Sequence, residues 1–364
     1  MKIVSSAREA AAVRVTDEAK IAAATAALVP PANEDGSTAV GEAALAEVRR
    51  LLGAWLAHEP GARLGHDPEE LHQLRVTARR LDATLSLFKQ HLPAPLLKAR
   101  KTAKSLLRSL GATRDLDVQL ASLNAYCEEL TEEERAALEP LKERLTLERA
   151  RVRARMLRAL DSEPTRRWIQ TLTAATEAPP AANSEGSAVT VAGVMPQRVR
   201  RRFRRLRKGV RRLRANSSMD DYHKVRRRAK QLRYALESGL DLYGKPADEM
   251  LKALRRMQDK LGAYQDAHMA RNHLTALAAD PACGLPPATL FHMGRLAEHH
   301  TRVTTEARST VTKSWRKVRG RRWKALRARL GEFEHRAPES LEPVSGAVAG
   351  LGNAPSPAAE ARPL

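Results

Sequence analysis

One short segment of the chain occurs twice, as HQLRVTARRL at residues 72–81 and as HKVRRRAKQL at residues 223–232, an offset of 151 residues. Consecutive residues of a helix are rotated by about 100°, so His72, Arg75 and Arg79 fall on one helical stripe. The apolar residues of the stripe beside it are Leu74, Ala78, Leu81, Leu85 and Phe88. The second copy repeats both stripes, with the cations His223, Arg226, Lys230 and Arg233 beside Val225, Ala229, Leu232 and Leu236. Each copy therefore predicts a helix that packs through one stripe and presents a row of cations on the next.

Helix start signals precede both copies. Asp67 stands before Pro68 and two glutamates, which is the order of an N-cap, a first helical residue and acidic residues near the positive end of the helix dipole. The second copy follows NSS at 216–218 and the acidic pair Asp220 and Asp221. The sequence thus predicts a helix start at the same place in each copy.

A second pair of landmarks has the same offset of 151 residues: LGATRD at 110–115 and LGAYQD at 261–266. We interpret each glycine as a helix break, and the aspartates that follow as caps of the next helix. Those aspartates are Asp115, Asp117 and Asp266. Because both landmarks keep one register with no net insertion between them, we predict an internal duplication. RRW at 166–168 and at 321–323 fits it, with the offset grown to 155.

The composition predicts an all-α chain. Leu, Ala, Arg and Glu dominate, hydrophobic residues make up 43% and aromatic residues only 4%, and no alternating β-branched runs occur. Together with the duplication, this predicts two helical bundles of about four main helices each. The expected boundaries are a disordered leader at 1–40, a first repeat at 41–176, a linker at 177–193, a second repeat at 194–335 and a disordered tail at 336–364.

The charge balance bounds the class of partner. The formal net charge is +22 and the pI is near 10.6, an excess that attracts phosphate polyanions or an anionic membrane. The two cysteines, Cys127 and Cys283, lie far apart, as is typical of a reducing compartment. The sequence shows neither an apolar run of membrane-spanning length nor a signal-peptide pattern, so we expect a cytoplasmic protein.

The repeated motifs resemble the CHAD family, which is named for its histidines and its helical build. The resemblance rests on both histidine-arginine helices, on both LGAxxD landmarks and on KQLRYALE at 230–237, and it covers roughly residues 41–333. It implies two helical bundles around a basic cavity that binds inorganic polyphosphate, and association with polyphosphate granules. Some members carry a tunnel-type triphosphatase domain, and since no strand-rich stretch precedes residue 41, we expect none here. Two positions depart from the repeat: Asp82 corresponds to Arg233, and Asp259 to Arg108.

Polyphosphate carries about one negative charge per unit and offers no base or sugar, so a protein recognises it by charge density and donor spacing. Arginine engages two phosphate oxygens with its planar fork, lysine offers a compact charge, and residues three or four apart on a helix lie about 5–6 Å apart. The predicted binding residues are His72, Arg75, Arg79, His223, Arg226, Lys230 and Arg233, with an outer set of Arg49, Lys101, Lys104, Arg201, Lys252 and Arg255. The alternatives are that the histidines bond to neighbouring helices and that the cations form a solvated face.

Two other functions stay open at this point. An arginine run at 198–214 favours a helical protein that binds duplex nucleic acid, although so few aromatic residues argue against single strands. A phosphohydrolase acting on polyphosphate or triphosphates needs acidic metal ligands on the basic face, and no convincing set is found. We therefore expect a binding protein that is not an enzyme and has neither a cofactor nor a metal site. The sequence leaves the oligomeric state open.

Overall fold

The computed structural model describes residues 37–177, 189–214 and 216–334. These residues form helices joined by short connections, and the extended pairing found among them is one isolated antiparallel bridge between Ala39 and Thr190. The all-α prediction is confirmed. Within this part of the chain, none of the helices combines the length and the apolar character that crossing a membrane requires.

The first bundle contains α2 (Val40–Leu64), α3 (Pro68–Leu87), α4 (Ala94–Cys127), α5 (Glu132–Asp161) and α6 (Glu163–Glu177). Gly65 ends α2 in the left-handed region, at φ 75°, and Pro60 lies inside the helix. The start predicted for α3 is confirmed, because Asp67 accepts a hydrogen bond of 2.8 Å from the Glu69 backbone N–H and Pro68 is the first helical residue.

The second bundle contains α7 (Val191–Arg212), α8 (Met219–Glu237), α9 (Leu240–Ala279), α10 (Pro287–Arg319) and α11 (Arg321–Glu334). Ser218 and Asp221 form a capping box at the start of α8. The helices α2 and α7 begin 151 residues apart, and so do α3 and α8, which is the register of the two sequence landmarks. The duplication itself stays a prediction.

Both apolar stripes of the repeated segment lie in the protein core. Leu74, Ala78, Leu81 and Leu85 are fully buried on α3, and Val225, Ala229, Leu232 and Leu236 are at most 1% exposed on α8. Burying a leucine side chain contributes about 1.5–3 kcal/mol to folding. The rotation of α3 and α8 about their axes is therefore set by these stripes, and it directs the neighbouring cationic stripes out of the core.

The helix breaks predicted at Gly111 and Gly262 are wrong. Gly111 lies in the middle of α4 and Gly262 in the middle of α9, and both glycines are buried. Glycine in a helix interior costs about 1 kcal/mol relative to alanine, and tertiary packing overrides this preference here. The aspartates Asp115, Asp117 and Asp266 are therefore interior helix residues and not caps.

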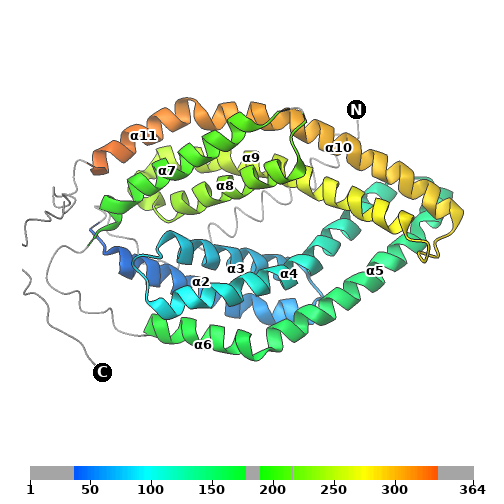
Figure 1. Ribbon diagram of the computed structural model, residues 1–364, viewed down its shortest axis with the longest axis horizontal. Helices are drawn as coiled ribbons and strands as arrows, with labels where there is room; N and C mark the ends of the chain where they lie inside the picture. The colour runs from blue at the N-terminus through cyan, green and yellow to red at the C-terminus, as the bar shows by residue number, and fades with distance from the viewer. Residues whose placement is uncertain (1–36, 178–188, 215, 335–364) are drawn as a thin grey trace, which may run out of the picture.

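The two bundles lie as two layers (Figure 1). In the middle, α3 of the first layer packs against α8 of the second, and near one end α5 packs against α10. That end has its own apolar core from both bundles, which includes Leu116, Leu123, Leu138, Leu141, Leu274 and Met293. At the starts of α2 and α7, Val40 N donates to Val189 O at 2.9 Å and Val191 N to Thr38 O at 3.0 Å. The layers are therefore joined at both ends and in the middle.

These backbone pairs adjust the predicted boundaries. Residues 38–40 of the predicted leader, and residues 177 and 189–193 of the predicted linker, belong to the folded part. The predicted tail at 336–364, most of the leader and most of the linker lie outside the described residues.

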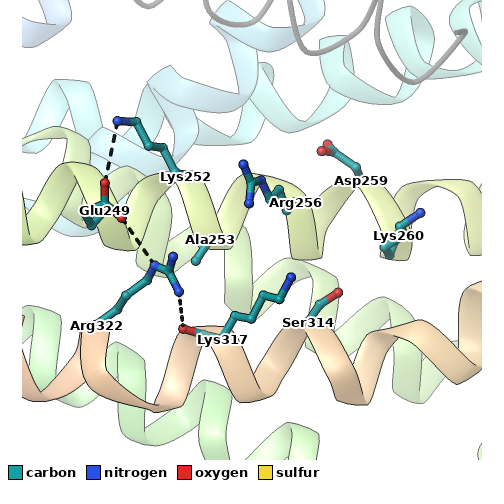
Figure 2. A pocket seen from close by; sticks show the side chains of 9 residues that line it. All are labelled: Glu249, Lys252, Ala253, Arg256, Asp259, Lys260, Ser314, Lys317 and Arg322. Atoms are coloured by element: carbon teal, nitrogen blue, oxygen red, sulfur yellow. Dashed lines mark hydrogen bonds and ion pairs between the residues drawn. The ribbon is translucent and has the colours of Figure 1, made fainter. Parts of the chain in front are cut away.

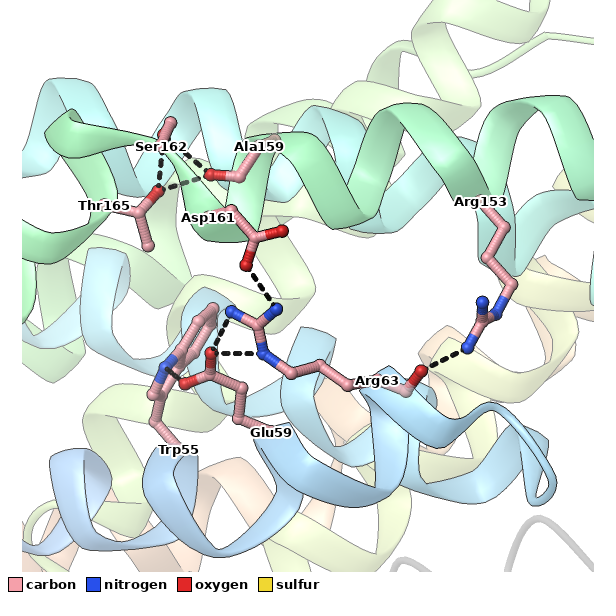
Figure 3. Close-up of polar contacts among 8 residues, drawn as sticks. All are labelled: Trp55, Glu59, Arg63, Arg153, Ala159, Asp161, Ser162 and Thr165. Carbon is pink, nitrogen blue, oxygen red and sulfur yellow. Dashed lines mark hydrogen bonds and ion pairs between the residues drawn. The ribbon is translucent and has the colours of Figure 1, made fainter.

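Where α2, α5 and α6 meet, cations are used for structure (Figure 3). Arg63 donates to Asp161 Oδ1 at 2.6 Å and to Glu59 Oε1 at 2.8 Å, and Glu59 also accepts from Trp55 Nε1 at 3.0 Å. Arg153 donates to the Arg63 main-chain oxygen near the end of α2. These arginines are balanced by acidic or carbonyl oxygens, so they serve to hold the first bundle together.

Candidate functional site

Five of the predicted cations come together where α3 faces α8. Burial lowers the pKa of the Lys230 ammonium group well below its ordinary value, and the charges of Arg226, Arg79, Arg233 and Arg75 lower it further. Two of these arginines are on α3 and two are on α8, so both cationic rows act on the same ammonium group. We call Arg75, Arg79, Arg226, Lys230 and Arg233 the central cluster.

Each helix places one arginine of the cluster against a glycine of the neighbouring helix. A Cβ atom at Gly111 would lie 3.5 Å from Arg75 Nε, and a Cβ atom at Gly262 would lie 3.4 Å from Arg226 Nη2. The glycines that the sequence suggested as helix breaks therefore open the surfaces of α4 and α9 to a guanidinium group. The first half of the site and the second half are built in the same way.

Two arginines and two aspartates act on the guanidinium group of Arg75, which is largely shielded from water. Burial, followed by the charge of Arg79, lowers the pKa of Arg75 to about 10, and the charge of Arg226 acts in the same direction. The opposing groups are Asp115, whose Oδ1 lies 3.5 Å from Arg75 Nη2, and Asp266. Because a lowered pKa means that the surroundings disfavour the charged form, the cluster favours the arrival of an anion.

Asp115 of α4 and Asp266 of α9 lie close enough to influence each other. Burial raises the pKa of the Asp115 carboxyl group, Arg75 opposes this, and Asp266 raises it further. Both aspartates thus border the central cluster, a position that our interpretation as caps missed. The usable signal was their spacing: each follows its glycine by four residues, which is about one helical turn. The third aspartate, Asp117, is buried and paired with Arg149 at 2.5 Å.

The two predicted histidines border the cluster at different points. Exposed His223 has its Nδ1 3.2 Å from Gln265 Oε1, which also accepts from Arg226 Nη1 at 3.0 Å. Half-buried His72 lines a small depression with Arg80, Arg233 and Arg255. Each histidine is therefore linked to the cluster by a different arginine of α8.

Glu237 of α8 collects cations from three helices, a role that the sequence did not predict. Its carboxylate oxygens lie 3.5 Å from Arg233 Nε, 3.6 Å from Arg80 Nη2 and 3.8 Å from Arg255 Nη2. Arg233 is 5% exposed and its guanidinium carbon lies 5.2 Å from the Tyr234 ring centroid. Since Arg80 belongs to α3 and Arg255 to α9, Glu237 ties the two bundles together at the edge of the cluster. The Arg233-to-Glu237 spacing of four residues was the available signal.

Of the outer set, Arg255 lies at the edge of the central cluster, where it pairs with Glu237. Arg49 donates to the main-chain oxygen of Thr176 in α6, and Lys252 Nζ lies 2.8 Å from Asp248 Oδ2. The remaining outer residues are exposed on α4 and α7: Lys101, Lys104 and Arg201. None of these contacts joins Arg49, Lys252 or the exposed lysines to the central cluster.

The departure from the repeat at Asp82 has a local explanation. Asp82 Oδ1 accepts a hydrogen bond of 2.9 Å from Arg100 Nε, which places a balanced pair where the second copy has Arg233. The second bundle therefore contributes more positive charge to the cluster than the first.

The arginine run at 198–214 is divided between internal contacts and solvent. Arg198 donates to the Leu87 main-chain oxygen at 2.7 Å, and Arg200 pairs with Glu334 at 2.9 Å. Burial, followed by the charge of Arg198, lowers the pKa of Arg202 to about 10. The exposed residues of the run are Arg201, Arg204, Arg205, Arg207, Arg211, Arg212 and Arg214.

Comparison with known proteins identifies the family. The sequence model of the CHAD domain matches residues 46–275, which is more than half of the chain and reaches from α2 into α9. The crystal structure of the CHAD domain from the plant Ricinus communis is 27% identical over 81% of this chain and 93% of that one, with a TM-score of 0.57.

PptA from Streptomyces chartreusis is 20% identical over 77% of this chain and 100% of its own, with a TM-score of 0.60, and shares the fold. No curated protein matches the sequence. The helices that supply both halves of the central cluster lie within the matched residues, and the chain belongs to the CHAD domain family.

Proposed function

We propose that this protein binds inorganic polyphosphate at the central cluster. The observation that carries the proposal is the crowding of four arginines from α3 and α8 around the ammonium group of Lys230, whose pKa is lowered by burial and further by these charges. Like charges held close together in a partly buried site raise the free energy of the unliganded protein. A bound polyanion offsets this repulsion, so the folded protein gains free energy when the polyanion binds.

The chemistry of the cluster suits a chain of phosphates. The guanidinium group of Arg75 keeps a buried Nε without a hydrogen-bond acceptor among the described residues, while its Nη2 lies 3.5 Å from Asp115. Such a planar fork binds two phosphate oxygens at once. Bordering cations such as Arg80 and Arg255 extend the positive surface beyond one phosphate. Release of counterions from the polymer would supply much of the affinity and make it fall with salt.

We propose that the protein binds polyphosphate without cleaving it. Its direct check is to incubate long-chain polyphosphate with the protein and magnesium or manganese, and to measure released phosphate. No release above the protein-free control is expected, and catalytic release would replace this proposal by a phosphohydrolase.

The decisive experiment compares two variants with equal changes of charge. The central variant replaces four residues of the central cluster by Glu: Arg75, Arg79, Arg226 and Lys230. The α7 variant replaces four exposed arginines by Glu: Arg204, Arg207, Arg211 and Arg212. A charge-assisted hydrogen bond contributes about 1.5–3 kcal/mol, so the central variant should lose at least about 100-fold in polyphosphate affinity. The α7 variant should lose only a few-fold. Circular dichroism verifies that both remain helical.

Equal losses of polyphosphate affinity in the two variants would mean that binding depends only on the net charge of the protein, and would refute the central site. Competition with duplex DNA tests the other partner class: polyphosphate of equal total charge should displace duplex. If duplex resisted displacement and its binding required the exposed α7 arginines, the protein would be a nucleic-acid binder instead.

We further propose that this binding brings the protein to polyphosphate granules in the cytoplasm. A fluorescent fusion of the wild type should form foci that coincide with polyphosphate staining, and a fusion of the central variant should be diffuse. Foci formed equally by the central variant would contradict this part of the proposal.

A further inference from the structure

A second basic site lies on the second bundle, between α9 on one side and the junction of α10 with α11 on the other (Figure 2). This pocket has a volume of about 350 Å³. Its cationic lining consists of Lys252, Arg256, Lys260, Lys317 and Arg322. We call it the side pocket.

The side pocket is separate from the central cluster because the two use different sides of α9. Arg255 turns toward Glu237 and α3, whereas the next residue, Arg256, lines the side pocket. Consecutive helical residues are rotated by about 100°. A ligand in the side pocket therefore meets a different row of α9, in which Lys252, Arg256 and Lys260 repeat every four residues.

The junction of α10 with α11 supplies the opposite wall. Lys317 lies in the last turn of α10, Arg322 in the first turn of α11, and Arg322 Nη1 donates to the Lys317 main-chain oxygen at 3.4 Å. This contact holds both cations on the side that faces α9, where Ser314 adds a hydroxyl group.

Two acidic side chains, Glu249 and Asp259, line the side pocket, and Glu249 balances the positive charge at one end of it. Glu249 lies 3.8 Å from Lys252 Nζ and 3.6 Å from Arg322 Nε, and Lys252 also pairs with Asp248. Toward the other end, Arg256, Lys260 and Lys317 form no ion pair with an acidic side chain inside the described ranges 37–177, 189–214 and 216–334. The lining therefore has five cationic and two acidic side chains, and the surplus positive charge lies at the end away from Glu249.

We propose that the side pocket binds a small anion that carries two or more phosphates, a function beyond the polyphosphate binding proposed for the central cluster. Its volume lies in the range of small-ligand sites, about 300–1,000 Å³. The Arg256 fork can engage two oxygens of one phosphate group, while Lys260 and Lys317 supply point charges for the next. A short phosphate chain, free or attached to an organic group, has this chemistry.

The test measures binding of inorganic triphosphate to the full-length protein by calorimetry, with ATP as a second probe. In the side-pocket variant, Arg256→Glu is combined with Lys317→Glu. Each lost charge-assisted hydrogen bond is worth about an order of magnitude, so triphosphate affinity should fall at least about 10-fold. A matched variant, Arg207→Glu with Arg319→Glu, reverses two exposed arginines outside the pocket and should change it less than about 2-fold. The milder Arg256→Gln with Lys317→Gln guards against misfolding.

The outcomes separate this inference from the proposed function. Long polyphosphate should bind the side-pocket variant within about 3-fold of the wild type, since the central cluster is intact. If triphosphate affinity fell only in the central variant, or equally in the side-pocket and matched variants, the side pocket would be refuted while polyphosphate binding stood. Parallel losses of triphosphate and ATP show that the phosphates are recognised; retained ATP binding would overturn the proposed phosphate recognition.

Discussion

Arg63 and Arg75 are both partly buried arginines of the first bundle, yet their surroundings act on them in opposite ways. Although burial alone lowers the pKa of Arg63, its hydrogen bonds to Asp161 and Glu59 raise it above the ordinary value. Around Arg75, burial and Arg79 lower the pKa to about 10. The contrast distinguishes an arginine whose charge is met by close hydrogen bonds to two carboxylates from one whose looser ion pair with Asp115, at 3.5 Å, does not offset its burial and the neighbouring arginines.

The comparison predicts first that ligand binding, and not internal pairing, stabilises the central cluster. Polyphosphate at 100 times its dissociation constant should raise the free energy of unfolding of the wild type by about 2.7 kcal/mol. The central variant should show almost no change at the same concentration. Thermal unfolding with and without polyphosphate measures this, and the α7 variant is the control. A stabilisation of equal size in the central variant would break the comparison.

A pair of substitutions by methionine, which keeps a long unbranched side chain, tests the contrast between Arg63 and Arg75 more sharply. Arg63→Met should reduce the free energy of unfolding by about 1 kcal/mol, because it removes hydrogen bonds to Glu59 and Asp161 that are partly screened by solvent. Arg75→Met should cause a smaller loss, since the ion pair with Asp115 that it removes is offset by the repulsion from Arg79 and Arg226 that it relieves. Polyphosphate affinity should respond in reverse, falling about 10-fold for Arg75→Met and remaining unchanged for Arg63→Met.

Denaturant unfolding and polyphosphate titration of both variants provide the readout. If Arg75→Met were the more destabilising of the two, Arg75 would be a structural arginine after all, and the two regions would not differ in the way proposed.

Much of this arrangement could be predicted from the sequence, because the period of the repeated segment specifies which face of a helix is buried. The apolar stripe through Leu74 and Leu81 and the cations beside it followed from spacing alone. The helix break predicted at Gly111 was wrong because helix propensity alone makes a glycine look like a break. In the structure this glycine lies inside α4 and faces the guanidinium group of Arg75. Glu237 was missed because periodicity does not show which neighbouring helix approaches, and for the same reason the contact of Arg49 with α6 could not be predicted.

The protonation of Lys230 offers a third test of the central cluster. The lowered pKa of Lys230 means that the unfolded chain binds more protons than the folded one between the folded-state pKa and the ordinary value of 10.5. The destabilisation caused by Lys230 is therefore fully present below the folded-state pKa and disappears as pH rises across this window. A bound polyanion raises that pKa again, so polyphosphate binding should take up protons.

Calorimetry in buffers of different ionisation enthalpy, at pH values below the ordinary lysine pKa of 10.5, should detect this proton uptake. The uptake should diminish in Lys230→Arg, which keeps the charge but does not titrate in this range. An unchanged uptake in Lys230→Arg would assign the proton to another group, of which Asp115 is the nearest candidate because its pKa is already raised by burial.

The smallest expected effect concerns the glycine beneath Arg75. A Cβ atom at Gly111 would lie 3.5 Å from Arg75 Nε, an ordinary contact, so Gly111→Ala should fit and raise the free energy of unfolding by about 0.5–1 kcal/mol. Polyphosphate affinity should stay within a few-fold. Gly111→Leu should displace the guanidinium and weaken binding about 10-fold, because the fork no longer faces the cluster. Gly53→Leu on α2, where a Cβ atom meets nothing within 4 Å, is the control and should leave binding unchanged. If Gly111→Leu bound polyphosphate as well as Gly53→Leu, the position of Arg75 against α4 would not matter for the ligand.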